Sequence, residues 1–166
     1  AINARNMEEM LDALVVLGKA GGREIEAAAL VANLKARIVK VKGTLTAAKG
    51  KPSVFVEIWN EPLMTAGSGT YVNELIELAG GVNIAGKVSG WPVFSHESVI
   101  SSDPFIILLT NFNRGEVMAR KAWSGLSAVK AGRVVESDPD LLIRCGPRLV
   151  DGLEMLARLL HPELFK

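Results

Sequence analysis

The fold is decided by the stretch Ser53-Val54-Phe55-Val56-Glu57-Ile58-Trp59, a run of β-branched and aromatic residues with a single charge. Such a run, without regular polar alternation, is typical of a strand that is mostly buried on both faces. A loop from Asn60 to Gly69 follows it, and the next segment, from about Thr70 to Ala79, has a helix pattern closed by Gly80-Gly81. The order strand, loop, helix indicates one unit of an α/β fold.

The same alternation continues to the end of the chain. Apolar strand patterns recur three times, and helix patterns lie between and after them. The expected strands lie at residues 82–84, 105–109 and 133–136, and the expected helices at about 96–101, 115–123 and 147–160. Strands separated by crossover helices predict an α/β fold, a three-layer sandwich with a largely parallel sheet.

Two helices are expected before the first strand. Asn6 caps a helix whose apolar residues recur at three- and four-residue spacing, and a group of glycines at 18–22 ends it. From Arg23 the helical pattern resumes and meets no proline until Pro52, which predicts a helix of about seven turns, about 40 Å long. This helix is read either as a strut between two bodies or as a cover on the sheet.

Composition and charge exclude several classes of protein. Lysine and arginine number 19 against 18 aspartates and glutamates, so the net charge of +1 offers no field to attract nucleic acid or an anionic membrane. Cys145 is the single cysteine, which excludes an internal disulfide and a zinc site built from cysteines. No apolar run approaches the roughly 20 residues that a membrane-spanning helix needs, and the first ten residues lack the pattern of an export signal.

The motifs of catalysis and metal binding are missing. His96 and His161 stand outside any metal-ligand spacing, and both are expected to be exposed and structural. The turn at 67–69 lacks the lysine and hydroxyl residue that complete a P-loop, so positive φ explains its glycines better than an anion cradle does. No nucleophile elbow is present. The sequence therefore predicts that the protein is not an enzyme and has no cofactor or bound metal.

Tryptophans are placed where strands end. In an open parallel sheet, ligands gather at the carboxyl ends of the strands, and Trp59 closes one strand while Trp91 lies on a loop between two others. Their rings suit an extended, largely apolar macrocycle or chelate. Core packing remains an equal alternative for Trp59, whereas the glycine and proline beside Trp91 favour exposure. Trp123, at a helix end, is expected in the core.

Three groups of motifs follow one another along most of the chain. They are residues 56–67 (VEIWNEPLMTAG) with 73–76 (NELI) and 79–84 (AGGVNI), then 91–97 (WPVFSHE) with 102–104 (SDP) and 106–109 (IILL), and finally 146–150 (GPRLV) with the helix up to His161-Pro162. In this order they resemble the carboxy-terminal lobe of the cobalamin and iron-chelate family of ABC-importer binding proteins.

The resemblance implies two α/β lobes joined by a rigid long helix, with the ligand held between the lobes. It assigns residues 1–22 to the end of the amino-terminal lobe and a short helix, 23–50 to the long backbone helix, and 51–166 to the carboxy-terminal lobe. Residues 1–3 would end the last strand of the amino-terminal lobe, and most of that lobe, with any export signal, would precede this chain. The implied location is extracytoplasmic, in the periplasm or on a cell-surface lipoprotein.

The implied function is capture of a metal chelate, namely cobalamin, a ferric siderophore or haem, and its delivery to the permease subunits of an ABC importer. The choice among these chelates stays open, because the other lobe holds deciding residues in this family, although Trp91 slightly favours cobalamin. Two other readings also stay open. One is an enzyme subunit for a small molecule on a related lobe, and the other is an interaction module that self-associates through the long helix.

The same resemblance assigns roles to single residues. Trp91 matches an aromatic residue that packs on the ligand, and Trp59 with Pro62 lies on a loop that lines the same cleft. Glu97 matches the outer carboxylate that meets arginines of the permease, although a first-turn glutamate is also favoured by the helix dipole. Arg148 matches a recurrent arginine before the last helix, where it contacts an anionic group of the ligand or ties down a loop.

Overall fold

The structure is a computed structural model, and residues 4–165 are described. The strand end expected at residues 1–3 lies outside the described residues. The helices are α1 (Met7–Ala20), α2 (Glu24–Leu45), α3 (Tyr71–Leu78), α4 (His96–Ser102), α5 (Arg114–Ala119), α6 (Ser127–Lys130), α7 (Pro139–Leu142) and α8 (Leu149–Leu160), with 3-10 turns η1 (Lys121–Trp123) and η2 (Pro162–Leu164). The strands are β1 (Ser53–Glu57), β2 (Trp59–Asn60), β3 (Leu63–Met64), β4 (Val82–Asn83), β5 (Ile106–Leu109) and β6 (Val134–Glu136).

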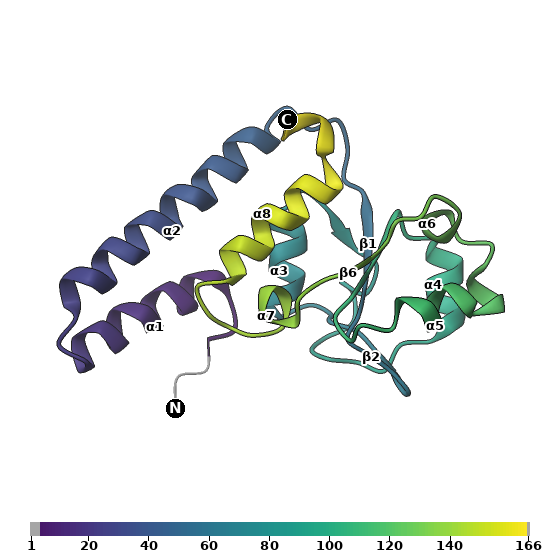
Figure 1. Cartoon of the computed structure of the whole chain (residues 1–166), viewed down its shortest axis with the longest axis horizontal. Helices are drawn as coiled ribbons and strands as arrows, with labels where there is room; N and C mark the ends of the chain where they lie inside the picture. The colour runs from purple at the N-terminus through teal and green to yellow at the C-terminus, as the bar shows by residue number, and fades with distance from the viewer. Residues whose placement is uncertain (1–3, 166) are drawn as a thin grey trace.

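Four parallel strands form the main sheet, in the order β4-β1-β5-β6. The predicted three-layer α/β sandwich with a parallel sheet is confirmed. In Figure 1 the helices α3, α7 and α8 cover one side of the sheet, and α4, α5 and α6 cover the other. Because β1 and β5 lie in the centre, the loops that follow them meet at the carboxyl edge of the sheet.

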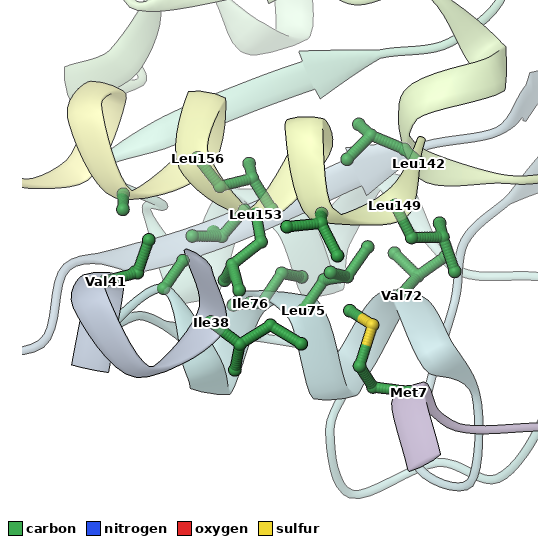
Figure 2. Close-up of a cluster of buried hydrophobic side chains, with 14 of the residues drawn as sticks. Met7, Ile38, Val41, Val72, Leu75, Ile76, Leu142, Leu149, Leu153 and Leu156 are labelled. Atoms are coloured by element: carbon green, nitrogen blue, oxygen red, sulfur yellow. The ribbon is translucent and has the colours of Figure 1, made fainter. Parts of the chain in front are cut away.

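Successive side chains of β1 and β5 enter opposite cores, because side chains alternate across a strand. Val54 and Val56 join the core beneath α3 and α8, whereas Phe55 packs on the other side with Trp123. Trp123 is fully buried, as predicted. Figure 2 shows the larger core, where Ile38 and Val41 of α2 meet side chains of α3 and α8.

The helices α1 and α2 form an antiparallel pair that packs against α8 and forms an outer layer beyond it (Figure 1). The predicted long helix is one unbroken helix of 22 residues, about 33 Å long. It ends at Leu45 rather than near residue 49, because the next three N–H groups bond three residues back instead of four: those of Thr46, Ala47 and Ala48 donate to the carbonyls of Gly43, Thr44 and Leu45.

Arg37 fastens α2 to α8. Its guanidinium donates to Asp151 at 2.6 Å and to both oxygens of Glu154 at 2.9 Å. These hydrogen bonds raise the pKa of Arg37 above its usual range and lower the pKa of the Glu154 carboxyl. The long helix is therefore held to the α/β body by charge as well as by apolar packing.

The expectation that both histidines are exposed is wrong for His161. Its ring is buried, and Nε2 lies 3.2 Å from the carbonyl oxygen of Gly80. The end of α8 packs on the end of α3, which removes the ring from water and gives it a backbone partner. His96 is exposed, as expected. Within residues 4–165, no helix is both long enough and apolar enough to span a membrane.

Candidate functional site

Trp59 lies outside the main sheet, although the sequence pattern runs on from β1. The strand β1 stops at Glu57, and Trp59 begins the two-residue strand β2, which pairs with β3 in an antiparallel ribbon. The side chain of Trp59 is 54% exposed, and its indole N–H donates to the carbonyl of Glu61 at 2.9 Å. Because the polar edge of the ring is satisfied within the ribbon, an apolar face remains open to solvent.

Trp91 is also exposed, on the segment that pairs with this ribbon. Trp59 pairs with Met64, and Met64 pairs with Val93, so these three side chains point to one side. Trp91 precedes Val93 by two residues, at a bend in the chain, and is 42% exposed. Each of the two tryptophans that the sequence proposed for one cleft therefore leaves part of its ring open to solvent.

Tyr71 supports the ring of Trp91 from α3. The two rings meet edge to face with centroids 5.7 Å apart, and the Tyr71 hydroxyl donates to the carbonyl of Ile143 at 2.5 Å. Burial raises the pKa of the Tyr71 phenol, so this donor stays protonated at neutral pH. Sequence reasoning missed Tyr71, because the helix pattern shows only that this face is apolar.

Pro62 and Glu97 are both exposed but lie on different parts of the site. Pro62 lies in the turn between β2 and β3, after a cis peptide bond. Glu97 lies in the first turn of α4, whose amino end is capped by the Ser95 hydroxyl. It lines a hollow of about 520 Å³ together with Arg120 and Trp123. This position is compatible both with a helix-dipole role and with contact to another protein.

Arg148 ties the loop after β6 to the start of α8. Its guanidinium donates to Asp138 at 2.7 Å and to Asp140 at 3.0 Å. The pKa of Asp138 is lowered by a backbone hydrogen bond from Asp140 and by Arg148, and the pKa of Arg148 is raised in return. Both carboxylates already engage the cation, which favours the loop-tying alternative for Arg148.

A buried carboxylate lies at the carboxyl end of β1, and the sequence reasoning did not single it out. Glu57 has no exposed surface and accepts from both terminal nitrogens of Arg120, at 2.5 and 3.0 Å. It also accepts from the side-chain amide of Asn113 at 2.7 Å. A signal was available, because a glutamate inside an otherwise apolar strand needs partners when it is buried.

A second hollow, of about 400 Å³, is lined in part by Asn111 and Asn113, whose side-chain amides contact this carboxylate. Its lining combines the exposed rings of Trp59 and Phe112 with polar side chains from β2, from the loop after β5 and from α5. Among residues 4–165, no group of three or more His, Cys, Asp or Glu side chains is placed to hold a metal ion. The side chains that line this hollow offer stacking and hydrogen bonding.

Known proteins are similar to this chain over most of its length. A family model described as periplasmic binding protein matches residues 2–141. An ABC transporter substrate-binding lipoprotein of Bacillus subtilis is 33% identical over 168 residues, covering 99% of this chain and 54% of the relative. A cobalamin-binding protein of Halobacterium salinarum is 25% identical over 169 residues, covering 95% of this chain and 45% of the relative. The chain thus spans about half the length of these relatives.

Solved structures of other proteins share this fold. A possible iron-binding, periplasmic solute-binding protein of Staphylococcus epidermidis superposes with a TM-score of 0.83 at 29% identity, over 95% of this chain and 63% of that one. A vitamin B12 binding protein of Vibrio cholerae gives 0.81 at 23% identity, over 99% and 65%, a similarity that concerns the fold alone. Because the family model matches far more than half of its residues, this chain belongs to the periplasmic binding protein family.

Proposed function

We propose that this chain is part of the substrate-binding protein of an ABC importer, located outside the cytoplasmic membrane, and that it captures a metal chelate. The candidate ligands are cobalamin, haem and a ferric siderophore. Family membership supports the class of protein, and the relatives named above include a cobalamin-binding protein, a vitamin B12 binding protein and a possible iron-binding protein.

The observation that carries the proposal is the exposure of two large rings, Trp59 on the β2–β3 ribbon and Trp91 on the segment that pairs with this ribbon. Two large rings left half open to water are costly for a monomer unless something covers them. A flat chelate with an apolar macrocycle provides that cover and needs few directed hydrogen bonds.

We further propose that this body forms one wall of the ligand cleft and that an upstream lobe forms the other. The half-length match to relatives and the long helix α2 support this arrangement. Pro62, at the tip of the ribbon, would extend the wall.

Binding is tested by tryptophan fluorescence quenching on the complete gene product, including any sequence encoded before Ala1. Cyanocobalamin, haemin and ferrioxamine B serve as the probes. For the probe that binds, Trp91→Ala should weaken affinity by about 1–3 kcal/mol if the ring stacks on the ligand. Ile25→Ala is the matched control, because Ile25 is an exposed apolar residue at the far end of α2. Equal affinity of the Trp91 variant and the control would assign Trp91 a structural role only.

Glu97 is proposed as a docking residue for the permease. Its exposure in the first turn of α4 leaves the carboxylate available for a charge-assisted pair with an arginine of another subunit. Glu97→Ala should leave ligand affinity unchanged and slow uptake in cells, whereas Glu24→Ala, on the helical pair, should affect neither. Normal uptake with Glu97→Ala would remove this assignment.

An enzyme subunit on the same lobe is the alternative that the sequence left open. The relatives of this chain are named as binding proteins, which favours ligand capture over catalytic turnover. Conversion of a small molecule that is abolished by changes in the loop at 60–69 would instead support the enzyme.

A further inference from the structure

Phe112 is an exposed aromatic residue in a strained backbone position. It lies three residues after the end of β5, its side chain is 65% exposed, and its φ is +53°. This left-handed region is disfavoured for residues that carry a Cβ, and a bulky ring there is unusual. A core role is excluded by the exposure, so packing does not explain why a phenylalanine rather than a glycine occupies this position.

The loop around Phe112 is tied down on both sides. Asn113 donates to Oε1 of Glu57 at 2.7 Å, and Asn111 is 3.5 Å from the same oxygen. On the downstream side, Arg114 donates its backbone N–H to Glu136 at 2.9 Å. Since Glu57 is itself buried and paired, these bonds fix the backbone and leave the ring of Phe112 directed away from the core. Strain that is maintained by its surroundings in this way is typical of functional sites.

Phe112 faces the same hollow as Trp59. Both rings line the cavity of about 400 Å³. The two walls are also connected, because the amide of Asn60 on β2 donates to Glu116 on α5 at 2.8 Å. Figure 1 shows the β2 ribbon and α5 at the same end of the molecule. The hollow is thus a defined space lined by two aromatic side chains, one from strand β2 and one from the loop after β5.

The charge of this hollow restricts what it can accept. Glu116 is the one charged side chain in its lining. The nearby guanidinium of Arg120 is already paired with Glu57. An anionic group placed here would meet a carboxylate and no unpaired cation, which is unfavourable. An uncharged group meets two apolar ring faces.

The geometry points to Phe112 as a further ligand-binding residue. Together with Trp59 it forms a two-ring subsite that takes an uncharged, flat or apolar portion of the bound chelate. This inference rests on the proposed capture of a chelate, and it adds the chemical class of the ligand surface that meets this lobe. Glu57, Asn111 and Asn113 are positioning residues for the ring.

The test compares Phe112→Gly and Phe112→Tyr with the unchanged complete gene product, using cyanocobalamin, haemin and ferrioxamine B. Glycine adopts positive φ without strain, so Phe112→Gly should raise the melting temperature. It should also weaken the probe that binds by about tenfold, the scale of one lost aromatic contact in a subsite. Phe112→Tyr should bind within about twofold of the unchanged protein. A residue with only a structural role would not give a more stable protein that binds more weakly.

Charge is tested separately with Glu116→Gln, which keeps an oxygen that can accept from Asn60. A change in affinity below about twofold supports an uncharged ligand portion, and a marked tightening would overturn it. Unchanged binding by Phe112→Gly would overturn the role of Phe112 while leaving the proposed capture of a chelate intact. Failure of the unchanged protein to bind any of the three probes would instead sink the proposed function, and this inference with it.

Discussion

Arg120 forms a bidentate ion pair with Glu57, with nitrogen to oxygen distances of 2.5 and 3.0 Å. The guanidinium also lies over the ring of Trp123, 4.5 Å from its centroid. Arg120, the residue after α5, therefore connects the end of β1 with the smaller core. Arg120 also lines the hollow of about 520 Å³.

Breaking this pair should be costly. Arg120→Met leaves the Glu57 carboxylate buried without its cation, and we expect a loss of about 3 kcal/mol in the free energy of unfolding. Urea denaturation followed by tryptophan fluorescence measures it. The double variant Glu57→Met with Arg120→Met should recover much of the loss. Arg144→Met, which removes an exposed ion pair with Asp140, is the control and should cost less than about 1 kcal/mol.

The Arg37–Glu154 ion pair that joins α2 to α8 should weaken in acid. Hydrogen bonds from Arg37 lower the pKa of Glu154 from its usual value of 4.5. The stabilisation is therefore complete above that value and is lost as the pH falls through the lower folded pKa. The urea midpoint should fall less between pH 6 and about pH 3 for Glu154→Gln than for the unchanged protein. The exposed Glu24→Gln should retain the full slope, and identical slopes for all three proteins would refute the assignment.

Tyr71→Phe should affect both stability and ligand binding. The change removes the hydrogen bond to Ile143 and leaves a partly buried carbonyl without that partner, so we expect a loss of about 1 kcal/mol. The Trp91 ring should then be held less firmly, and affinity for the bound probe should fall about twofold to fivefold. Denaturation and titration of the same sample measure the two effects. Unchanged affinity would show that Trp91 is oriented without Tyr71.

Gly67 should not tolerate a side chain. A Cβ at this position would lie 1.8 Å from the backbone oxygen of Val88, so Gly67→Ala should destabilise the protein by more than about 2 kcal/mol. Gly115→Ala is the matched control, because nothing lies within 4 Å of its Cβ position. Within helix α5 that control should be neutral or stabilising by up to about 1 kcal/mol. Thermal melts of both variants decide the comparison.

We also propose that the 166-residue chain self-associates through the α1–α2 pair. Val16 and Val39 are both more than half exposed on these helices. Sedimentation should show dimer or higher forms at high concentration, and the double variant Val16→Lys with Val39→Lys should be monomeric. Glu24→Lys adds the same net charge of two and should still associate. A monomer at every concentration would refute this surface.

The repeating patterns made the architecture predictable. The apolar run at 53–59, the strand at 105–109 and the glycine-terminated helices each report a local preference, and together they required a parallel α/β sheet. The long helix from Arg23 was also predictable, because no proline or glycine pair interrupts it before residue 49. Its early end at Leu45 was not, since the backbone changes to three-residue hydrogen bonding from Thr46 onward without a proline or glycine to signal it.

The site was only partly predictable. Trp91 between glycine and proline signals an exposed ring, but the sequence does not show that Tyr71 supports it from another element. Trp59 was undecided between core and cleft, and its place was decided by pairing with Met64 rather than with the main sheet. Arg148 likewise had two readings until the positions of Asp138 and Asp140 were known.

By itself, the sequence determined the four strands of the main sheet, most of the helices around it, and the family that the ordered motifs resemble. These properties follow from spacing along the chain, because periodicity and turn residues act between close neighbours. Only the tertiary structure decided that Glu57 meets Arg120 from 63 residues away, and that Phe112 shares a hollow with Trp59. Contacts of that kind depend on strand order and register, which local preferences do not encode.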